Sequence, residues 1–356
     1  MDGTKAVIAA AKENNVPKLV YTSSAGVVFN GQDLIYVDER IPFPDKPLDA
    51  YNESKAKAEE AVLAANGTDG LLTVALRPAG IFGWVSLLVQ EEEHCKLTYH
   101  TIISPGDRQV IRGFAQVLEE GRSHFQIGDN TNLFDWTYVG NVAHAHILAA
   151  DKLVPQGPST PDMIEEALDT ALPSIDLSTG RQRVPTSSAR PLGPYVERPE
   201  NADALIAAFE GPHKPERPVI RSRFDPLSDT ALKRAGTDPL TVAGQAFFIT
   251  NGEPVYFWDF PRRLWRMLRP DTYPARDPLV LPKTVGFMLA TLAEWWGWLS
   301  GREPTFTRFR VAFTCAQRWH NIEKARRVLG YEPQVGLEEG MRRTVEVCVA
   351  FALPVA

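Results

Sequence analysis

The feature that most constrains the fold is an alternation of two short apolar runs with one amphipathic segment in the first 80 residues. Residues 18–24, KLVYTSS, are rich in residues that favour strands. Residues 49–66 carry alanines and charges at helical spacing, and residues 71–76 form the second apolar run. Short apolar runs are typical of buried parallel strands, and strand–helix–strand order is typical of α/β folds. The sequence therefore predicts an α/β fold with a doubly wound parallel sheet.

The whole chain divides into three regions of different composition. Residues 1–150 follow the alternating pattern, except at residues 84–104, which have neither clear periodicity nor turn residues. Residues 151–240 hold 13 of the 28 prolines, which predicts a largely irregular insert. Helical patterns predominate in residues 241–356, so this region is expected to form a smaller, mainly helical lobe with C-terminal helices.

Charge and cysteine content argue against several classes of protein. The net charge of −6 does not fit a nucleic-acid-binding surface. The three cysteines, Cys95, Cys315 and Cys348, are widely spaced and odd in number, so neither a disulfide framework nor a metal cluster is expected. His144 and His146 are two residues apart, which puts them on different sides of a helix, so no metal site is expected there.

The clearest chemistry belongs to Tyr51 and Lys55, in the helix expected over 49–66. At a separation of four residues, the two side chains leave the same helix face about 5–6 Å apart. A phenol has a pKa of about 10, and a neighbouring cation lowers this pKa toward the range of a useful base. Ser24, at the end of the preceding strand, is a candidate to hold a substrate oxygen beside that phenol. Taken alone, the pair also fits an ordinary exposed helix pair.

The order of motifs around Tyr51 resembles that of the extended short-chain dehydrogenases. Ser24 ends its strand 27 residues before the tyrosine, and the sequence Arg77-Pro78-Ala79-Gly80-Ile81-Phe82-Gly83 follows the helix, as RPxxxxG does in that family. The resemblance implies a Rossmann-like fold that binds NAD or NADP.

The same resemblance implies roles for individual residues. The catalytic residues would be Ser24 and Tyr51, which hold the substrate oxygen, and Lys55, which lowers the tyrosine pKa. Ser23 is the alternative serine, and hydrogen bonding at a strand end is its other expected role. The cofactor would be bound by residues on both motifs, namely Tyr51, Lys55, Pro78, Ala79, Gly80 and Ile81.

Further segments narrow the resemblance to the 3β-hydroxysteroid dehydrogenase/isomerase family, closest to the sterol-4α-carboxylate 3-dehydrogenases. Residues 134–146 resemble the family's FxYVxNVAxAH segment, and residues 247–260 resemble the segment that supports its substrate lobe. Residues 321–333 resemble the family's C-terminal region. The resemblance implies oxidation of a 3β-hydroxyl to a 3-ketone; on a 4α-carboxysterol the product is a β-keto acid, which then loses carbon dioxide readily.

Two departures from the family pattern lead to expectations about the chain's boundaries. No GxxGxxG fingerprint opens the chain, although in this family that loop binds the cofactor pyrophosphate. The chain is therefore expected to be N-terminally truncated, with the first strands of the sheet missing and NAD(P) binding weak. Residues 84–104 separate Gly83 from Pro105, which related sequences join directly, and are interpreted as an aberrant insert; a natural loop is the alternative.

Two other functions fit parts of the sequence. A nucleotide-sugar epimerase or reductase on the same scaffold would need a polar, basic pocket, whereas the aromatic residues in 247–260 and 285–299 favour an apolar substrate. An inactive fragment without cofactor affinity is favoured by the absence of the fingerprint. Titration with the cofactor distinguishes this fragment from an enzyme.

Residues 279–299 are expected to form a segment that lies on a membrane surface. Their 21 residues could span hydrocarbon, but Lys283 and Glu294 lie within them and Pro282 interrupts a straight helix. Three residues typical of the headgroup region end the segment, Trp295, Trp296 and Trp298. An interfacial segment is therefore preferred, with a buried helix of the substrate lobe as the alternative.

The expected location is the cytosolic face of the endoplasmic reticulum membrane, with the cytoplasm as the alternative. The expected partners are a sterol substrate and either a second copy of the chain or a complex of sterol demethylation; no nucleic acid and no metal are expected.

Overall fold

A computed structural model describes residues 2–83, 110–155, 240–271, 278–301 and 306–352, together with a few positions between these ranges. The insert expected at 84–104 lies outside the described residues, as do nearly all of residues 151–240. Cys95 and the side chain of Cys348 also lie outside them, whereas Cys315 is a free, partly buried thiol.

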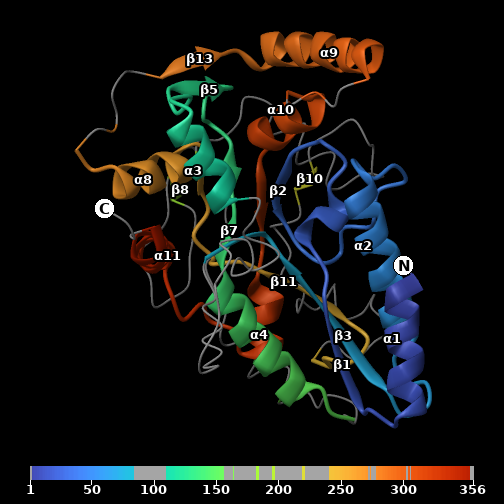
Figure 1. Ribbon diagram of the computed structural model, residues 1–356. Helices are drawn as coiled ribbons and strands as arrows, with labels where there is room; N and C mark the ends of the chain where they lie inside the picture. Colours follow the sequence, from blue (N-terminus) through green and yellow to red (C-terminus); the bar gives the residue numbers. More distant parts are fainter. Residues whose placement is uncertain are drawn as a thin grey trace, which may run out of the picture.

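A parallel sheet carries the first part of the chain (Figure 1). It consists of β1 (Lys18–Thr22), β3 (Leu72–Pro78) and β11 (Ala246–Ile249), in the order β1-β3-β11. Val20 is paired with Val74, and Phe247 with Leu76, so the three carboxyl ends lie at one edge. The predicted parallel sheet and its strands at 18–24 and 71–76 are confirmed, but β1 is a partly exposed edge strand and not the buried strand that its apolar run predicts.

Helices cover both faces of this sheet (Figure 1). They are α1 (Asp2–Glu13), α2 (Ala50–Ala64) and α4 (Val139–Lys152). α1 packs on α2 through a small apolar cluster that includes Ile8, Val62 and Leu71, while α4 contacts β1 and β3. The helix predicted over 49–66 is confirmed, and helices on both faces give the doubly wound arrangement.

A second sheet is mixed and joins segments from distant parts of the sequence. Its strands are, in order, β10 (Val219–Ile220), β2 (Leu34–Val37), β14 (Arg318–His320), β6 (Leu133–Phe134) and β12 (Val255–Tyr256). Three strand pairs complete the described sheet structure: β4 (Gly80–Phe82) with β7 (Trp136–Tyr138), β5 (Phe125–Ile127) with β13 (Leu279–Leu281), and β8 (Gln182–Arg183) with β9 (Tyr195–Val196).

An aromatic core holds the second lobe together. Trp136 stacks on Phe260 with ring centroids 4.1 Å apart, and Trp265 is buried beside them. The helices around this core are α3 (Ile111–Glu119), α8 (Asp259–Leu268) and α11 (Leu337–Ala352). Residues 111–134 thus belong with the second core, whereas 246–249 return to the first sheet. The domain boundaries at 150 and 241 stay a prediction.

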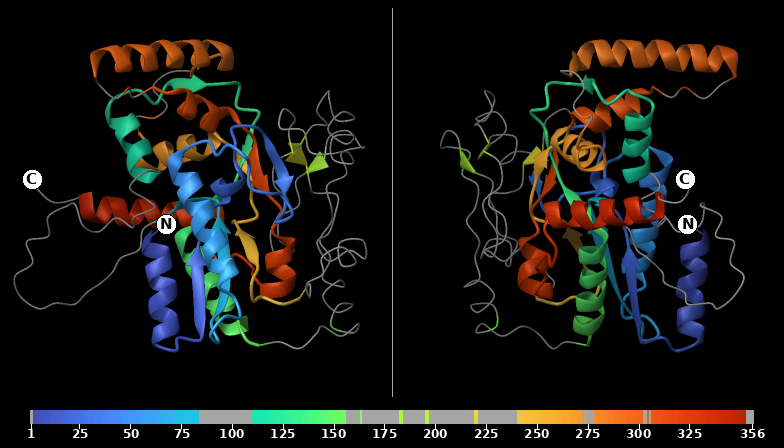
Figure 2. Two further views of the ribbon diagram at one scale, coloured as in Figure 1. Left: turned by 90° about the vertical axis from the view of Figure 1, so that its right-hand side faces the viewer. Right: turned by 60° about the vertical axis from the view of Figure 1, so that its left-hand side comes forward.

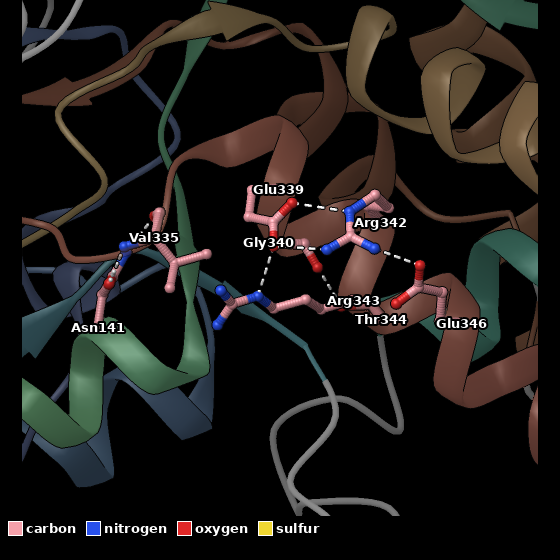
Figure 3. Close-up of polar contacts among 8 residues, drawn as sticks. All are labelled: Asn141, Val335, Glu339, Gly340, Arg342, Arg343, Thr344 and Glu346. Atoms are coloured by element: carbon pink, nitrogen blue, oxygen red, sulfur yellow. Dashed lines mark hydrogen bonds and ion pairs between the residues drawn. The ribbon is translucent and has the colours of Figure 1, made fainter.

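Asn141, in the first turn of α4, joins segments that are far apart in the sequence (Figure 3). Its Nδ2 donates to Oδ1 of Asn251 at 2.8 Å and to the carbonyl of Val335 at 2.7 Å, and its Oδ1 accepts from the Val335 amide at 3.0 Å. The Tyr331 hydroxyl donates to the buried Thr250 carbonyl at 2.9 Å. Residues 325–329 form a short π-helical turn, η2 (Ala325–Leu329), in which the Gly330 amide donates to the Ala325 carbonyl five residues earlier.

Helices α9 (Lys283–Ser300) and α10 (Arg308–Cys315) lie at one end of the molecule (Figure 2). That end is the one toward which β1 and β3 run. The helix of the segment 279–299 begins only at Lys283, after Pro282, and residues 279–281 form β13 instead. Within the described part of the chain, no helix combines the length and the apolar content needed to cross a membrane.

Candidate active site

Ser24 and Tyr51 face each other from two adjacent helix starts at the carboxyl edge of the parallel sheet. Ser24 follows β1 and caps the short 3-10 helix η1 (Ala25–Val28), where its hydroxyl accepts from the Gly26 amide at 3.1 Å. Tyr51 lies in the first turn of α2, and its phenol is hydrogen-bonded to the Ser24 side chain. The two predicted residues are therefore brought together, and Tyr51, 59% exposed, is open to a ligand.

A close approach between η1 and α2 fixes this geometry. Asp49 caps α2 by accepting from the Asn52 amide at 2.7 Å and from its Nδ2 at 2.8 Å. The Asn52 side chain is buried against Gly26, where an added Cβ would overlap the Asn52 amide oxygen. Glycine at position 26 is therefore required for the distance between the two helix starts, and through it for the Ser24–Tyr51 hydrogen bond.

Lys55 lies one turn after Tyr51, as expected, but it is directed toward β1. Its Nζ donates to the Thr22 carbonyl at 2.8 Å and lies 5.1 Å from the centroid of the Tyr21 ring. Burial lowers the pKa of Lys55. Two of its three N–H donors are left for a ligand, since an ammonium has three donors and this contact uses one.

The pKa of Tyr51 is raised, which corrects the lowering expected from its pairing with Lys55. Partial burial is the largest cause, and the negative charge of Asp49 raises the pKa further, whereas the hydrogen bond with Ser24 lowers it. Since Lys55 is held by the Thr22 carbonyl, burial outweighs the expected effect of the cation. The phenol is therefore protonated at neutral pH in this state.

Ser23, the alternative serine, is hydrogen-bonded to the carboxylate of a buried ion pair. Its hydroxyl donates to the Glu59 carboxylate, and its amide donates to the Leu76 carbonyl at 2.7 Å. Glu59 is fully buried and accepts from Arg77 Nε at 3.0 Å and Nη2 at 2.6 Å. Ser23 therefore has the expected hydrogen-bonding role at a strand end, and Ser24 remains as the serine that faces Tyr51.

The residues predicted to line the nicotinamide pocket lie at the same edge of the sheet. Pro78 ends β3, and the Ala79 amide then donates to the Ile249 carbonyl at 3.1 Å. The chain next leaves the sheet, so that Gly80 and Ile81 pair with β7. An added Cβ at Gly80 would lie 2.9 Å from the Phe134 ring, so this turn packs tightly against the second lobe.

The two histidines of α4 point in different directions, as predicted. His146 Nε2 lies 2.6 Å from Thr22 Oγ1, beside the carbonyl that binds Lys55. His144 Nε2 lies 3.2 Å from Nε2 of Gln334 on the opposite side. No group of acidic, histidine or cysteine side chains suited to a metal ion occurs among the described residues.

Several residues of the site were not identified from the sequence. Asp49 could have been recognised as a helix cap, because it stands just before the amphipathic run. No sequence pattern indicated the pairing of Glu59 with Arg77 or the contact of His146 with Thr22, since both depend on contacts between separate elements.

Comparisons with known proteins show what the chain is similar to. The sequence model of the 3-beta hydroxysteroid dehydrogenase/isomerase family matches residues 1–92 and 93–165. The sterol-4-alpha-carboxylate 3-dehydrogenase, decarboxylating, of Saccharomyces cerevisiae is 38% identical over 344 residues, which cover 96% of this chain and 69% of that protein. The enzyme of the same name from Schizosaccharomyces pombe is 38% identical over 348 residues, with 97% and 70% covered. The crystal structure of gox2253 is similar in fold, with a TM-score of 0.55 at 16% identity over 98% of this chain and 71% of that one.

Proposed function

The chain belongs to the 3-beta hydroxysteroid dehydrogenase/isomerase family, and from this membership we propose that it oxidises the 3β-hydroxyl of a 4α-carboxysterol to a 3-ketone with NAD or NADP. The single observation that supports the chemistry most directly is the hydrogen bond between Ser24 and an exposed Tyr51. The relatives at 38% identity are named for sterol acids, which favours a sterol over a nucleotide sugar.

The site suits a nicotinamide cofactor. Ligands of open parallel sheets bind outside the carboxyl ends of the strands, where Tyr51 and Lys55 lie next to the turn of residues 78–81. The remaining donors of Lys55 would bind the ribose, and residues 78–81 would line the nicotinamide pocket. NAD or NADP bound there would supply the acceptor for the hydride of carbon 3.

The protein's own groups handle the proton. The Ser24 hydroxyl, held by the Gly26 amide, orients the 3-oxygen beside Tyr51. The tyrosine oxygen takes the hydroxyl proton as the carbon–oxygen double bond forms. Positive charge brought close to the phenol must first lower its raised pKa, and the Lys55 ammonium is the nearest group on the same helix face that can supply it.

Loss of carbon dioxide then needs no dedicated side chain. In the β-keto acid, the bond from carbon 4 to the carboxylate breaks, and its electron pair forms the enolate of the 3-ketone. Protonation of that enolate at carbon 4 gives the ketone.

Replacement of the Tyr51 phenol tests this proposal. With a 4α-carboxysterol and NAD or NADP, Tyr51→Phe should lower turnover by about 100-fold or more, as loss of a general base does. Tyr273→Phe is the matched control, because this partly buried tyrosine packs on Trp265 in the other lobe. The measurement is reduced cofactor by absorbance together with released carbon dioxide. Full turnover in the Tyr51 variant would contradict its role, and a wild-type protein that is inactive even at saturating cofactor would contradict the proposed reaction.

The proposal includes attachment to the cytosolic face of the endoplasmic reticulum membrane through α9. Its small residues Gly286, Ala290 and Gly297 face the protein, whereas its large apolar residues face outward. The most exposed of these are Met288 (65%), Leu292 (64%), Trp295 (70%), Trp296 (71%), Trp298 (82%) and Leu299 (67%). A continuous apolar surface with three tryptophans is typical of an interfacial helix and supports this attachment.

Flotation with phosphatidylcholine liposomes tests the attachment. We expect wild-type protein to float and the variant Trp295→Ala, Trp296→Ala, Trp298→Ala to stay in the soluble fraction. Val7→Ala with Ile147→Ala is the control, since these apolar side chains are 55% and 60% exposed on other helices. If the wild-type protein stays soluble, or the control loses flotation equally, attachment through α9 is wrong. Association with a second copy or with a sterol-demethylation complex stays a prediction.

A further inference from the structure

Arg318, the first residue of β14, holds a partly buried positive charge inside a cage of aromatic rings. Its guanidinium carbon lies 3.8 Å from the centroid of the Phe313 ring and 4.5 Å from those of Phe29 and Phe134. Among the described residues, none forms an ion pair or hydrogen bond with this guanidinium, and its buried Nε has no partner. An arginine in such a setting lacks the partner that a buried charge normally has.

The cage adjoins the elements that form the active site. Phe29 ends the 3-10 helix η1, which Ser24 begins. Phe134 packs against Gly80, in the turn predicted to line the nicotinamide pocket. The negative charge that raises the pKa of Arg318 belongs to Asp49, the cap of the helix that carries Tyr51. Arg318 therefore lies among the segments that position Ser24, Tyr51 and Gly80.

The surroundings of Arg318 favour one type of ligand, because they leave donors of its guanidinium without an acceptor. Burial lowers the pKa of Arg318 to about 9, so the group is still a cation at neutral pH. Asp49 acts on this charge only from a distance, since no ion pair or hydrogen bond joins Asp49 to Arg318 in the described part of the chain. Aromatic rings cover the faces of a guanidinium but leave its in-plane N–H donors available. These donors form a fork that matches a carboxylate.

We propose that Arg318 binds the 4α-carboxylate of the sterol and thereby determines specificity for the acid. This assignment rests on the proposed function, because a carboxylate on carbon 4 is adjacent to the carbon 3 oxygen held by Ser24 and Tyr51. The contact serves recognition and not decarboxylation, since an arginine–carboxylate pair favours the charged acid over departing neutral carbon dioxide. Loss of carbon dioxide therefore follows release of the carboxylate from Arg318.

Binding measurements on the full chain test this assignment without a need for turnover. A 4α-carboxysterol and its methyl ester, which has nearly the same shape but no charge, are each titrated with detection by intrinsic tryptophan fluorescence. Wild-type protein should bind the acid about 10- to 100-fold more tightly than the ester, the range of a charge-assisted hydrogen-bond pair. Arg318→Gln should abolish that ratio without weakening ester binding, and Arg318→Lys, which keeps the charge but not the fork, should reduce the ratio less.

Arg112→Gln is the matched control, because this exposed arginine lies on α3, outside the cage. The control should keep the wild-type ratio. Equal weakening of acid and ester in Arg318→Gln would mean that the arginine only supports the fold, and would overturn the assignment. If that variant does not fold, the acid-to-ester binding ratio of the wild type and of the Arg318→Lys variant still tests the assignment. Equal binding of acid and ester by wild type, or binding of neither, would also overturn it. Selective binding of the acid without formation of reduced cofactor would instead contradict the proposed oxidation alone.

Discussion

Helix α2 buries a glutamate near its centre, whereas helix α9 holds three tryptophans in solvent. Glu59 of α2 is fully buried, and Trp298 of α9 is 82% exposed. The glutamate is stabilised in the interior because Arg77 and Ser23 both donate to it. The tryptophans face outward because the residues of α9 that contact α10 and β5 are small, such as Gly286.

The comparison shows that available partners, and not residue type, decide which side chains are buried. Removal of an ion from water costs several kcal/mol, so Glu59 is stable inside only while its donors are present. An exposed tryptophan costs little in this way, but it offers apolar surface to a partner. Stability and attachment should therefore respond to different residues, and four changes test this.

The largest effect is expected at Glu59. Glu59→Gln leaves Arg77, 5% exposed, without its carboxylate and should lower the free energy of unfolding by about 3–5 kcal/mol. Urea denaturation measures this. Glu60→Gln, at the exposed next position of the same helix, should change it by less than about 0.5 kcal/mol. Similar values for the two variants would show that the Glu59–Arg77 pair does not stabilise α2.

The two serines after β1 should separate stability from catalysis. Ser23→Ala removes a hydrogen bond to a buried carboxylate and should cost about 1–3 kcal/mol of stability with turnover retained. Ser24→Ala should cost at most about 1 kcal/mol, as loss of a helix cap does, but lower turnover by about 100-fold. A loss of turnover in the Ser23 variant alone would reverse the assignment of the two serines.

The tryptophans of α9 should contribute little to stability in the absence of lipid. Replacement of Trp295, Trp296 and Trp298 together by alanine should change the free energy of unfolding by less than about 1 kcal/mol, because all three are exposed. Trp265→Ala, at a position 1% exposed in the aromatic core, should cost about 3–5 kcal/mol. A large loss in the triple variant would place these side chains in a packed core.

The smallest effect is expected at Glu339 of α11, an exposed carboxylate that accepts from Arg342 and Arg343 (Figure 3). These hydrogen bonds lower the pKa of Glu339 to about 2, from 4.5. Its contribution to stability is therefore present above pH 4.5 and is lost as the pH falls toward 2. The melting temperature of Glu339→Gln should differ slightly from wild type at pH 7, and the difference should shrink in 1 M salt or at low pH. A difference independent of salt and pH would exclude this ionic cause.

The sequence predicted those structural features that depend on residues close together in the chain. The apolar runs at 18–24 and 71–76 and the helix at 49–66 were recognised because each pattern is local. The meeting of Ser24 with Tyr51 was expected from the order of the motifs and from the family resemblance. By contrast, the pairing of Glu59 with Arg77 and the cage around Arg318 depend on how separate elements pack.

Two properties could not be predicted from the sequence pattern. The direction of the Tyr51 pKa shift depends on burial and on where Lys55 is held, which the spacing of the two residues does not specify. The outward face of α9 was ambiguous because apolar residues surround the whole helix, so that only the size of its side chains distinguishes inner from outer positions.

The hydrogen bonds of Asn141 have a consequence for how the protein folds during synthesis. Asn141 is bonded to Asn251, 110 residues later in the chain, and to Val335, 194 residues later. Such contacts close long loops, which slows folding. At about 5–20 residues per second, a ribosome needs roughly 10–40 seconds to pass from the first partner to the last. Throughout that interval the start of α4, beside the catalytic edge, lacks its final partners, so this region completes its packing only late in synthesis.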